Sequence, residues 1–124
     1  MIANYEPQHL TSLGPKQDYA DALNNHAFTY FEDGRVSACG GFIDMGPRTM
    51  VWLYTGTMRN PTAFFRAARK VLKETKYRRI ETVAVSAFGH RLARLLGFTW
   101  EGVLHAYNED GSDADLYAIW QQHQ

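Results

Sequence analysis

The sequence predicts an α+β fold with a mixed sheet, in which an antiparallel meander joins a βαβ unit and a C-terminal hairpin. Apolar strands over 49–55 and 80–85 flank an amphipathic helix over 61–75, and a strand-helix-strand succession of this length requires parallel neighbouring strands. The Asp33-Gly34 pair between two alternating segments indicates a hairpin before that unit. Gly97 ends a second helix after it, and apolar segments then flank an acidic loop.

The length and composition predict one globular domain spanning residues 1–124, in which residues 1–26 form a weakly patterned helical segment. The single cysteine, Cys39, excludes an internal disulfide and is expected to be a small buried residue in a reducing compartment. The first residues lack the basic and apolar regions of a secretion signal, and no apolar run reaches membrane-spanning length. We therefore expect a soluble, cytoplasmic protein.

The first elements are predicted from turn residues and alternation. Short helical segments are expected over 10–13 and 18–25. Gly40-Gly41, inside a predicted strand, indicates a bulge or a close backbone approach. The strand over 49–55 is apolar on both faces, which is typical of a central strand. The three strands of the meander are expected over 28–32, 35–43 and 49–55.

The two long helices have recognisable boundaries. Asn60 is expected to cap the first, with Pro61 at its first position, and Ser86 is expected to cap the second, over 86–96. Gly97 should adopt the left-handed conformation that ends the second helix. The side chains expected to be buried are Phe64, Ala68, Val71, Leu72 and Thr75 in the first helix and Phe88, Leu92, Leu95 and Leu96 in the second. The final hairpin is expected over 98–107 and 115–120, around the loop 108–113.

The charged residues are unevenly distributed although the net charge is zero. Ten Lys or Arg against two acids give +8 over 59–94, whereas five acids and no Lys or Arg give −5 from Glu101 onward. A solvated basic helix face balanced by an acidic hairpin would explain this, and so would a binding surface for a phosphorylated cofactor, nucleic acid or an acidic protein. The histidines show no metal-ligand spacing, so no metal site is predicted; they are His9, His26, His90, His105 and His123.

The order of the elements resembles that of the GNAT acyltransferases, which pass an acyl group from acyl-coenzyme A to an amine. The resemblance covers about residues 28–120. Its most specific part is Ser86-Ala-Phe-Gly-His-Arg-Leu-Ala-Arg-Leu-Leu-Gly-Phe98, followed by Glu101-Gly102. Family members commonly show Asn, a small residue, Leu-Tyr and Gly-Phe at this spacing, with Glu-Gly soon after.

The resemblance implies that acetyl-CoA is the co-substrate. Parallel strands that separate beside Leu53 would leave backbone groups free to pair with the pantetheine arm. The pyrophosphate would lie on amides at the start of the helix that follows, where the helix dipole favours negative charge. The residues that the resemblance assigns to acetyl-CoA are Leu53, Tyr54, Thr55, Gly56, Thr57, Met58, Arg59, Asn60, Ser86, His90 and Arg91.

The sequence departs from the family pattern at the positions that usually carry out the chemistry. The phosphate loop lacks its second glycine and contains Met58 and Pro61, and the tyrosine that often protonates the thiolate is replaced by Ala93. The acidic base of the central strand is missing as well. Tyr54, Glu81 and His105 are the candidate catalytic substitutes, because each can titrate and His105 has an ordinary pKa near 6.5. An ordinary buried or surface role is the alternative for each.

Three functions follow from these observations. The first is an acyl-CoA-dependent N-acetyltransferase that acts on an amine of a protein or a small molecule. The second is a catalytically degenerate GNAT-like phage protein that binds a host or virion protein, since 51–57 and 64–69 resemble short phage-encoded members of the family. Nucleic-acid binding through the basic residues of 66–79 is disfavoured because no aromatic platform or reading motif accompanies them.

Overall fold

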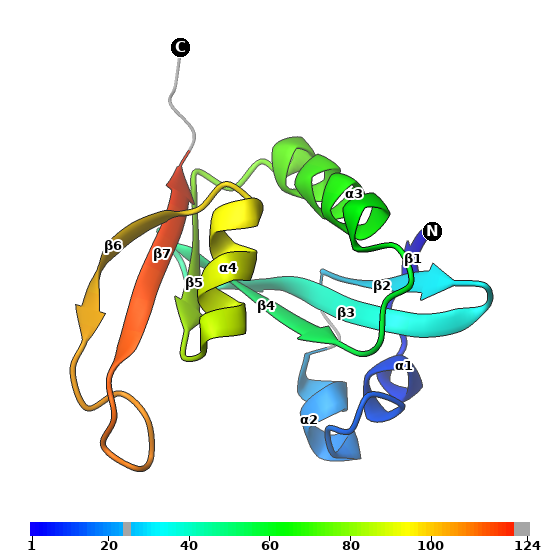
Figure 1. Cartoon of the computed structure of the whole chain (residues 1–124), viewed down its shortest axis with the longest axis horizontal. Coiled ribbons are helices and arrows are strands. Elements are labelled where there is room, and N and C mark those ends of the chain that lie inside the picture. Colours follow the sequence, from blue (N-terminus) through cyan, green and yellow to red (C-terminus); the bar gives the residue numbers. More distant parts are fainter. Residues whose placement is uncertain (24–25, 121–124) are drawn as a thin grey trace. The chain divides into compact units, whose positions relative to one another are not determined.

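The computed structural model describes residues 1–23 and 26–120, in which seven strands form one mixed sheet (Figure 1). The strands are β1 (Ile2–Asn4), β2 (Ala27–Glu32), β3 (Arg35–Asp44), β4 (Thr49–Thr55), β5 (Arg79–Ala84), β6 (Thr99–Leu104) and β7 (Ala114–Trp120). The helices are α1 (Pro7–Thr11), α2 (Gln17–Ala22), α3 (Pro61–Glu74) and α4 (Ala87–Leu95). The strand order β1-β2-β3-β4-β5-β7-β6 confirms the predicted α+β fold with a mixed sheet.

The chain divides into two compact units. The first comprises Met1–Asp44 and Val51–Ala67, and the second comprises Met45–Met50 and the residues from Ala68 onward. Strand β4 and helix α3 each contribute residues to both units. The single domain expected from the sequence stays a prediction.

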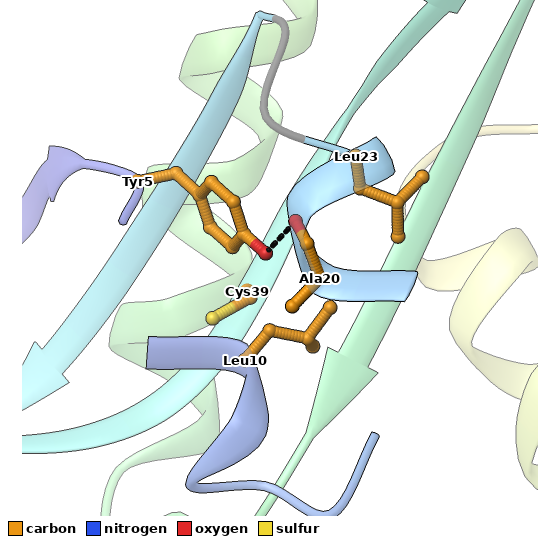
Figure 2. Packing of buried hydrophobic residues seen from close by; sticks show 5 residues of the cluster. All are labelled: Tyr5, Leu10, Ala20, Leu23 and Cys39. Atoms are coloured by element: carbon orange, nitrogen blue, oxygen red, sulfur yellow. Dashed lines mark hydrogen bonds between the residues drawn. The ribbon is translucent and has the colours of Figure 1, made fainter. Parts of the chain in front are cut away.

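The core of the first unit lies where α1 and α2 pack against the strands (Figure 2). Leu10 and Cys39 are fully buried there, and the Tyr5 hydroxyl donates a hydrogen bond of 2.8 Å to the Ala20 carbonyl. Burial is the main reason why the pKa of Tyr5 rises to about 12. Burial likewise raises the pKa of the Cys39 thiol. The prediction that Cys39 is a small buried residue is confirmed.

The turn of the β2–β3 hairpin was predicted correctly, because Asp33 and Gly34 both have positive φ, 51° and 76°. The bulge lies between Tyr30 and Phe31, so Gly40-Gly41 is a close approach instead. A Cβ atom on Gly40 would lie 3.1 Å from the Trp52 carbonyl oxygen. A side chain at this position would require the β4 backbone to move by a few tenths of an ångström.

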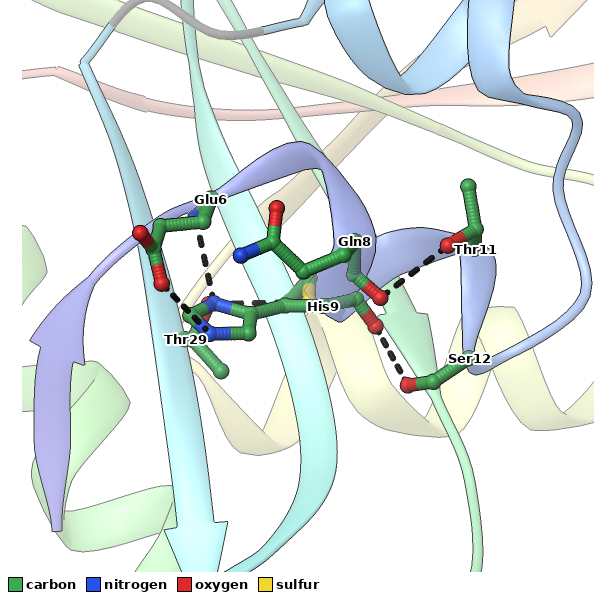
Figure 3. Close-up of polar contacts among 7 residues, drawn as sticks. Glu6, Gln8, His9, Thr11, Ser12 and Thr29 are labelled. Atoms are coloured by element: carbon green, nitrogen blue, oxygen red, sulfur yellow. Dashed lines mark hydrogen bonds and ion pairs between the residues drawn. The ribbon is translucent and has the colours of Figure 1, made fainter.

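The N-terminal segment contains a strand that the sequence did not reveal. Strand β1 pairs antiparallel with β2, and α1 follows from Pro7 rather than from residue 10. The His9 imidazole fixes this connection: Nδ1 lies 3.1 Å from the Glu6 amide nitrogen and 2.8 Å from Thr29 Oγ1 (Figure 3). Helix α2 begins one residue before the predicted helix over 18–25, of which Asn24 and Asn25 lie outside the described residues.

The second unit contains the predicted parallel pair and the closing hairpin. Thr49 and Met50 of β4 pair with Ile80 and Glu81 of β5, and β7 lies antiparallel between β5 and β6. Strand β6 ends at Leu104, before the predicted end at 107, since the chain turns at Ala106 with a φ of 54°. The predicted separation of β4 from β5 beside Leu53 stays a prediction.

The boundaries of α4 follow the predicted signals. The Ser86 hydroxyl accepts a hydrogen bond of 3.1 Å from the Gly89 amide, which confirms the N-cap. Gly97 has a φ of 93°, and the Phe98 amide donates to the Ala93 carbonyl at 2.9 Å.

The predicted buried face of α4 is wrong in part. Phe88 and Leu95 are 57% and 39% exposed, whereas Ala93 is only 4% exposed. A Cβ atom on Gly89 would lie 3.5 Å from the Cβ of Ala84 in β5. The helix therefore faces β5 through its small residues, and the large apolar side chains lie beside that contact. Among the described residues, no helix is long and apolar enough to span a membrane.

Candidate functional site

The loop before α3 is organised by an acidic side chain that the sequence did not single out. The two carboxylate oxygens of Glu32 accept hydrogen bonds from the backbone amides of Arg59, at 3.0 Å, and Asn60, at 2.9 Å. The Ser37 hydroxyl donates a third bond, of 2.8 Å. The Arg59 amide, followed by the Asn60 amide and the Ser37 hydroxyl, lowers the pKa of Glu32 below its ordinary value near 4.5.

The amides expected to hold a pyrophosphate are thus bonded to a carboxylate of the same chain. The geometry suits an anion, but a phosphate at these two amides would have to displace Glu32. The Arg59 guanidinium is paired with the Asp33 carboxylate. The Asn60 side chain caps α3 as predicted, because its Oδ1 accepts a bond of 3.1 Å from the Ala63 amide.

The remaining predicted residues for acetyl-CoA lie on β4, on the loop after it and on α4. Leu53, Tyr54 and Thr55 are half-buried in the strand, and the Gly56 amide donates to the Ser37 carbonyl at 2.8 Å. Among the loop side chains, that of Thr57 is exposed and that of Met58 is half-buried. The roles of these residues in binding stay predictions.

The predicted catalytic residue Glu81 lies in a network of charged side chains. It is only 5% exposed, its Oε2 accepts a hydrogen bond of 2.6 Å from Arg79 Nε, and Arg48 Nη1 lies 3.8 Å from Oε1. Arg79 also forms a two-bond contact with Glu101, which raises the arginine's pKa and lowers that of Glu101. These guanidinium contacts hold the carboxylate in place within the second unit. A catalytic role for Glu81 stays a prediction.

The other two predicted catalytic residues lie in different settings. His105 is strongly exposed and its Nδ1 lies 3.1 Å from Asp113 Oδ2. The Ala106 amide and then His105 lower the pKa of Asp113, so this contact orders the acidic loop. Tyr54 lies in the first unit, where its ring makes an edge contact with Trp52 at 6.2 Å between centroids. A catalytic role for either stays a prediction.

A chain of titratable side chains in the second unit was missed by the sequence reasoning. Nδ1 of His90, on α4, lies 2.9 Å from the hydroxyl of Tyr117, on β7. Nε2 of the same ring lies 3.2 Å from Asp115 Oδ2, and the Trp100 indole donates a bond of 2.8 Å to the other carboxylate oxygen. Tyr117 is 3% exposed. Of these residues, the sequence reasoning singled out only His90, as a phosphate ligand. In the structure its two ring nitrogens contact Tyr117 and Asp115.

The other two candidates on α4 differ from His90. The Ser86 hydroxyl is engaged in the helix cap, and Arg91 is exposed on the helix surface. In the part of the chain that the structure describes, no group of His, Cys, Asp or Glu is placed to hold a metal ion.

Known structures with the same fold are N-acetyltransferases of several kinds. The ribosomal-protein-S18-alanine N-acetyltransferase of Escherichia coli aligns over 100% of this chain and 95% of its own, with a TM-score of 0.78 and 14% identity. The aminoglycoside 6′-N-acetyltransferase of Enterococcus faecium aligns over 100% and 98%, with a TM-score of 0.77 and 12% identity. The microcin C7 self-immunity acetyltransferase, solved with acetyl-CoA and AMP, aligns over 85% and 69%, with a TM-score of 0.70 and 16% identity.

The likeness is one of structure, since identity is low in all three cases. No protein-family model matches the sequence, and neither does any curated protein. The chain thus has the fold of the GNAT acetyltransferases.

Proposed function

We propose that this protein is an acyl-CoA-dependent N-acyltransferase that transfers an acetyl group to an amine of a protein or a small molecule. The observation that carries the proposal is the alignment of the whole chain with almost the whole of two N-acetyltransferases, one for a ribosomal-protein alanine and one for aminoglycosides. Both enzymes are named for their acceptors, and these acceptors differ in size and chemistry. The fold therefore supports the reaction and leaves the acceptor open.

Residues of β4 and of the loop after it are the proposed binding site for the acyl donor. Leu53, Tyr54 and Thr55 would contact the pantetheine, and the amides between Gly56 and Asn60 would meet the pyrophosphate. The carboxylate of Glu32 at two of these amides supports the view that the loop accepts an anion. It also means that donor binding includes the release of Glu32, so the donor should bind less tightly than it would to a vacant loop.

A thermal-shift titration with acetyl-CoA tests this proposal. Ligand at 100 times its dissociation constant should stabilise the fold by about 2.7 kcal/mol, which corresponds to a rise of several degrees in Tm. The matched control is Glu32→Gln, which removes the competing charge and should bind acetyl-CoA more tightly. A Tm that stays constant up to millimolar acetyl-CoA in both proteins would exclude the proposal.

The acceptor can be sought once donor binding is established. Release of the coenzyme A thiol should be followed with three amines: a peptide with an N-terminal alanine, a peptide with an internal lysine and an aminoglycoside. Thiol release that depends on one of these amines would identify the acceptor class. If acetyl-CoA binds but no amine in a wide set causes thiol release, a second candidate function, protein binding without catalysis, would be favoured.

That second candidate is a GNAT-like scaffold that binds another protein, which the resemblance to phage-encoded proteins would make a host or virion protein. Two observations favour it: Glu32 is bonded to the loop amides, and Ala93 stands where a proton-donating tyrosine is usual. Basic residues on α3 and acids in the loop after β6 would be the contact surfaces. A pull-down that returns no stoichiometric partner, from a protein that binds coenzyme A well, would exclude this candidate.

A further inference from the structure

We propose that this protein recognises its acyl donor by the pantetheine arm, so that it also accepts acyl-pantetheine thioesters that carry no nucleotide. This inference rests on the proposed acyl transfer and names the class of donor. Its basis is the loop between β4 and α3, in the first unit, where Glu32 occupies two amides that a pyrophosphate would need.

The Glu32 carboxylate is held on this loop by three donors. One of its oxygens accepts from the Arg59 amide and the Ser37 hydroxyl, and the other accepts from the Asn60 amide. Ser37 is only 3% exposed, so its hydroxyl has little access to water once the carboxylate leaves. A phosphate that takes the two amides therefore breaks three hydrogen bonds, one of them from a buried residue.

Three further positions in or beside the loop offer a phosphate little. The Gly56 amide donates to the Ser37 carbonyl at 2.8 Å, and the Ala63 amide donates to the Asn60 side chain at 3.1 Å. Pro61, the first residue of α3, has no N–H. An anion site at a helix start depends on free amides, and these positions supply none without breaking a contact of the chain.

The charged side chain of the loop is also engaged. Arg59 is the only Lys or Arg between Gly56 and Asn60, and its guanidinium is paired with the Asp33 carboxylate. The nucleotide of acetyl-CoA brings several phosphate charges to this place, where it would meet two carboxylates and an arginine that is already neutralised. Pantetheine itself carries no charge.

A pantetheine thioester without a nucleotide avoids this cost. Leu53, Tyr54 and Thr55, the residues proposed to contact the arm, precede the loop and are half-buried in β4. Selectivity is a difference between two affinities, and the release of Glu32 is required only by the ligand that brings a phosphate to the amides. Glu32 therefore weakens the binding of acyl-CoA and leaves the binding of the nucleotide-free thioester unchanged.

The transfer step is the same whichever carrier holds the arm. The amine nitrogen forms a bond to the thioester carbonyl carbon and loses one proton, while the carbon–sulfur bond breaks and the sulfur gains one proton. The products are the N-acetyl amine and the free thiol of the carrier. The nucleotide takes no part in these bonds.

Binding to the unmodified protein tests the inference without relying on a variant. Isothermal titration calorimetry should compare acetyl-CoA with S-acetylpantetheine, which has the same arm and no phosphate. We expect the two Kd values to lie within about tenfold of each other, a difference of less than about 1.4 kcal/mol. Acetyl-CoA that binds more than tenfold tighter would overturn the inference and leave the proposed function standing. If neither thioester binds, both are excluded.

Glu32→Gln should change the two affinities differently. Glutamine has one acceptor oxygen in place of two, so at least one loop amide loses its acceptor. Acetyl-CoA should then bind about tenfold tighter, because the lost contact is a hydrogen bond to a charged group. The Kd for S-acetylpantetheine should stay the same.

Asp33→Asn is the matched control for the loss of charge. It removes the neighbouring carboxylate and leaves both amide contacts of Glu32 in place, so it should change the Kd for acetyl-CoA less than Glu32→Gln does. Equal effects of the two variants on acetyl-CoA would overturn the inference, and so would equal tightening of both thioesters by Glu32→Gln.

Transfer assays distinguish the two sources of such an arm. The donors are S-acetylpantetheine and an acetylated acyl carrier protein, which holds the same arm through one phosphodiester, and the acceptors are the three amines named above. The N-acetyl product is measured by mass spectrometry. Transfer from either donor supports the inference, and the faster donor identifies the source as a small thioester or a carrier protein. Transfer from acetyl-CoA with neither of these donors active would overturn the inference and keep the proposed function.

Discussion

Contacts from side chains to backbone amides stand out in the first unit, and contacts between charged side chains stand out in the second. In the first unit, Glu32 and His9 contact backbone amides, so each fixes the course of a nearby loop. In the second unit, side chains contact one another: Arg79 joins Glu81 to Glu101, and His90 joins Tyr117 to Asp115. Contacts to amides can only hold the chain in place. Contacts between titratable groups can also exchange protons.

The largest expected effect concerns the core of the first unit. Leu10→Ala should lower the free energy of unfolding by about 2–5 kcal/mol, because the side chain is fully buried and the neighbouring residues cannot close the cavity. Chemical denaturation followed by tryptophan fluorescence measures the loss. Leu13→Ala, at the half-buried edge of the same cluster, should cost clearly less. Equal losses would show that the core extends further than these contacts indicate.

The next effect concerns the charge network of the second unit. Glu81→Gln should lower the free energy of unfolding by about 1–3 kcal/mol, because it removes a buried carboxylate that contacts two arginines. The loss stays moderate because Arg79 and Arg48 are partly exposed, so water can solvate their guanidinium groups. Denaturation curves at pH 7 measure the effect. Glu101→Gln removes the more exposed partner of Arg79 and should cost less. A larger loss for Glu101→Gln than for Glu81→Gln would mean that the Arg79–Glu101 pair contributes more to the stability of this unit.

A smaller effect is expected at the start of α4. Ser86→Ala removes the hydroxyl that accepts from the Gly89 amide and should cost about 1 kcal/mol. Ser86→Asp keeps a capping oxygen and should restore most of the stability. Both values come from the same denaturation experiment. If alanine and aspartate are equally stable, the cap contributes nothing and the helix is held by its contact with β5.

The smallest effect is expected at Glu32, whose carboxylate is open to solvent. Its pKa is lowered in the folded state, so the stability it contributes is present above its ordinary value near 4.5 and is lost as the pH falls through the lowered value. Wild type should therefore be more stable than Glu32→Gln at pH 7, and this difference should shrink in acid. Hydrogen exchange at the Arg59 and Asn60 amides should be faster in the variant.

Unchanged exchange at these two amides would show that other groups protect them. Asp33→Asn is the matched control, because it removes the carboxylate that pairs with the Arg59 side chain and leaves both amide contacts in place.

Local signals were sufficient to predict most of the fold. Asn60, Ser86 and Gly97 act on residues within three or four positions, so their caps and turns could be recognised in the sequence. Strand β1 could not be recognised, because three residues carry too little pattern. The face of α4 was misjudged because periodicity favoured its large apolar residues, whereas the contact with β5 requires small ones.

The candidate site was harder to predict than the fold, since its contacts join residues that are far apart in the sequence. Glu32 lies 27 residues from Arg59, and His90 lies 27 residues from Tyr117. No spacing rule links such pairs. An acid directly before the Asp33-Gly34 turn was the only available signal for Glu32, and a tyrosine in an apolar strand was the only one for Tyr117.

The burial of Cys39 gives the protein a built-in probe of its own fluctuations. It is the only cysteine of the chain and is fully buried among α1, α2 and the strands, so a thiol reagent can reach it only when that packing opens. The labelling rate of the unmodified protein therefore measures how often the first unit opens. Comparing the labelling rate with and without acetyl-CoA would show whether a ligand at the loop before α3 makes opening of the first unit less frequent.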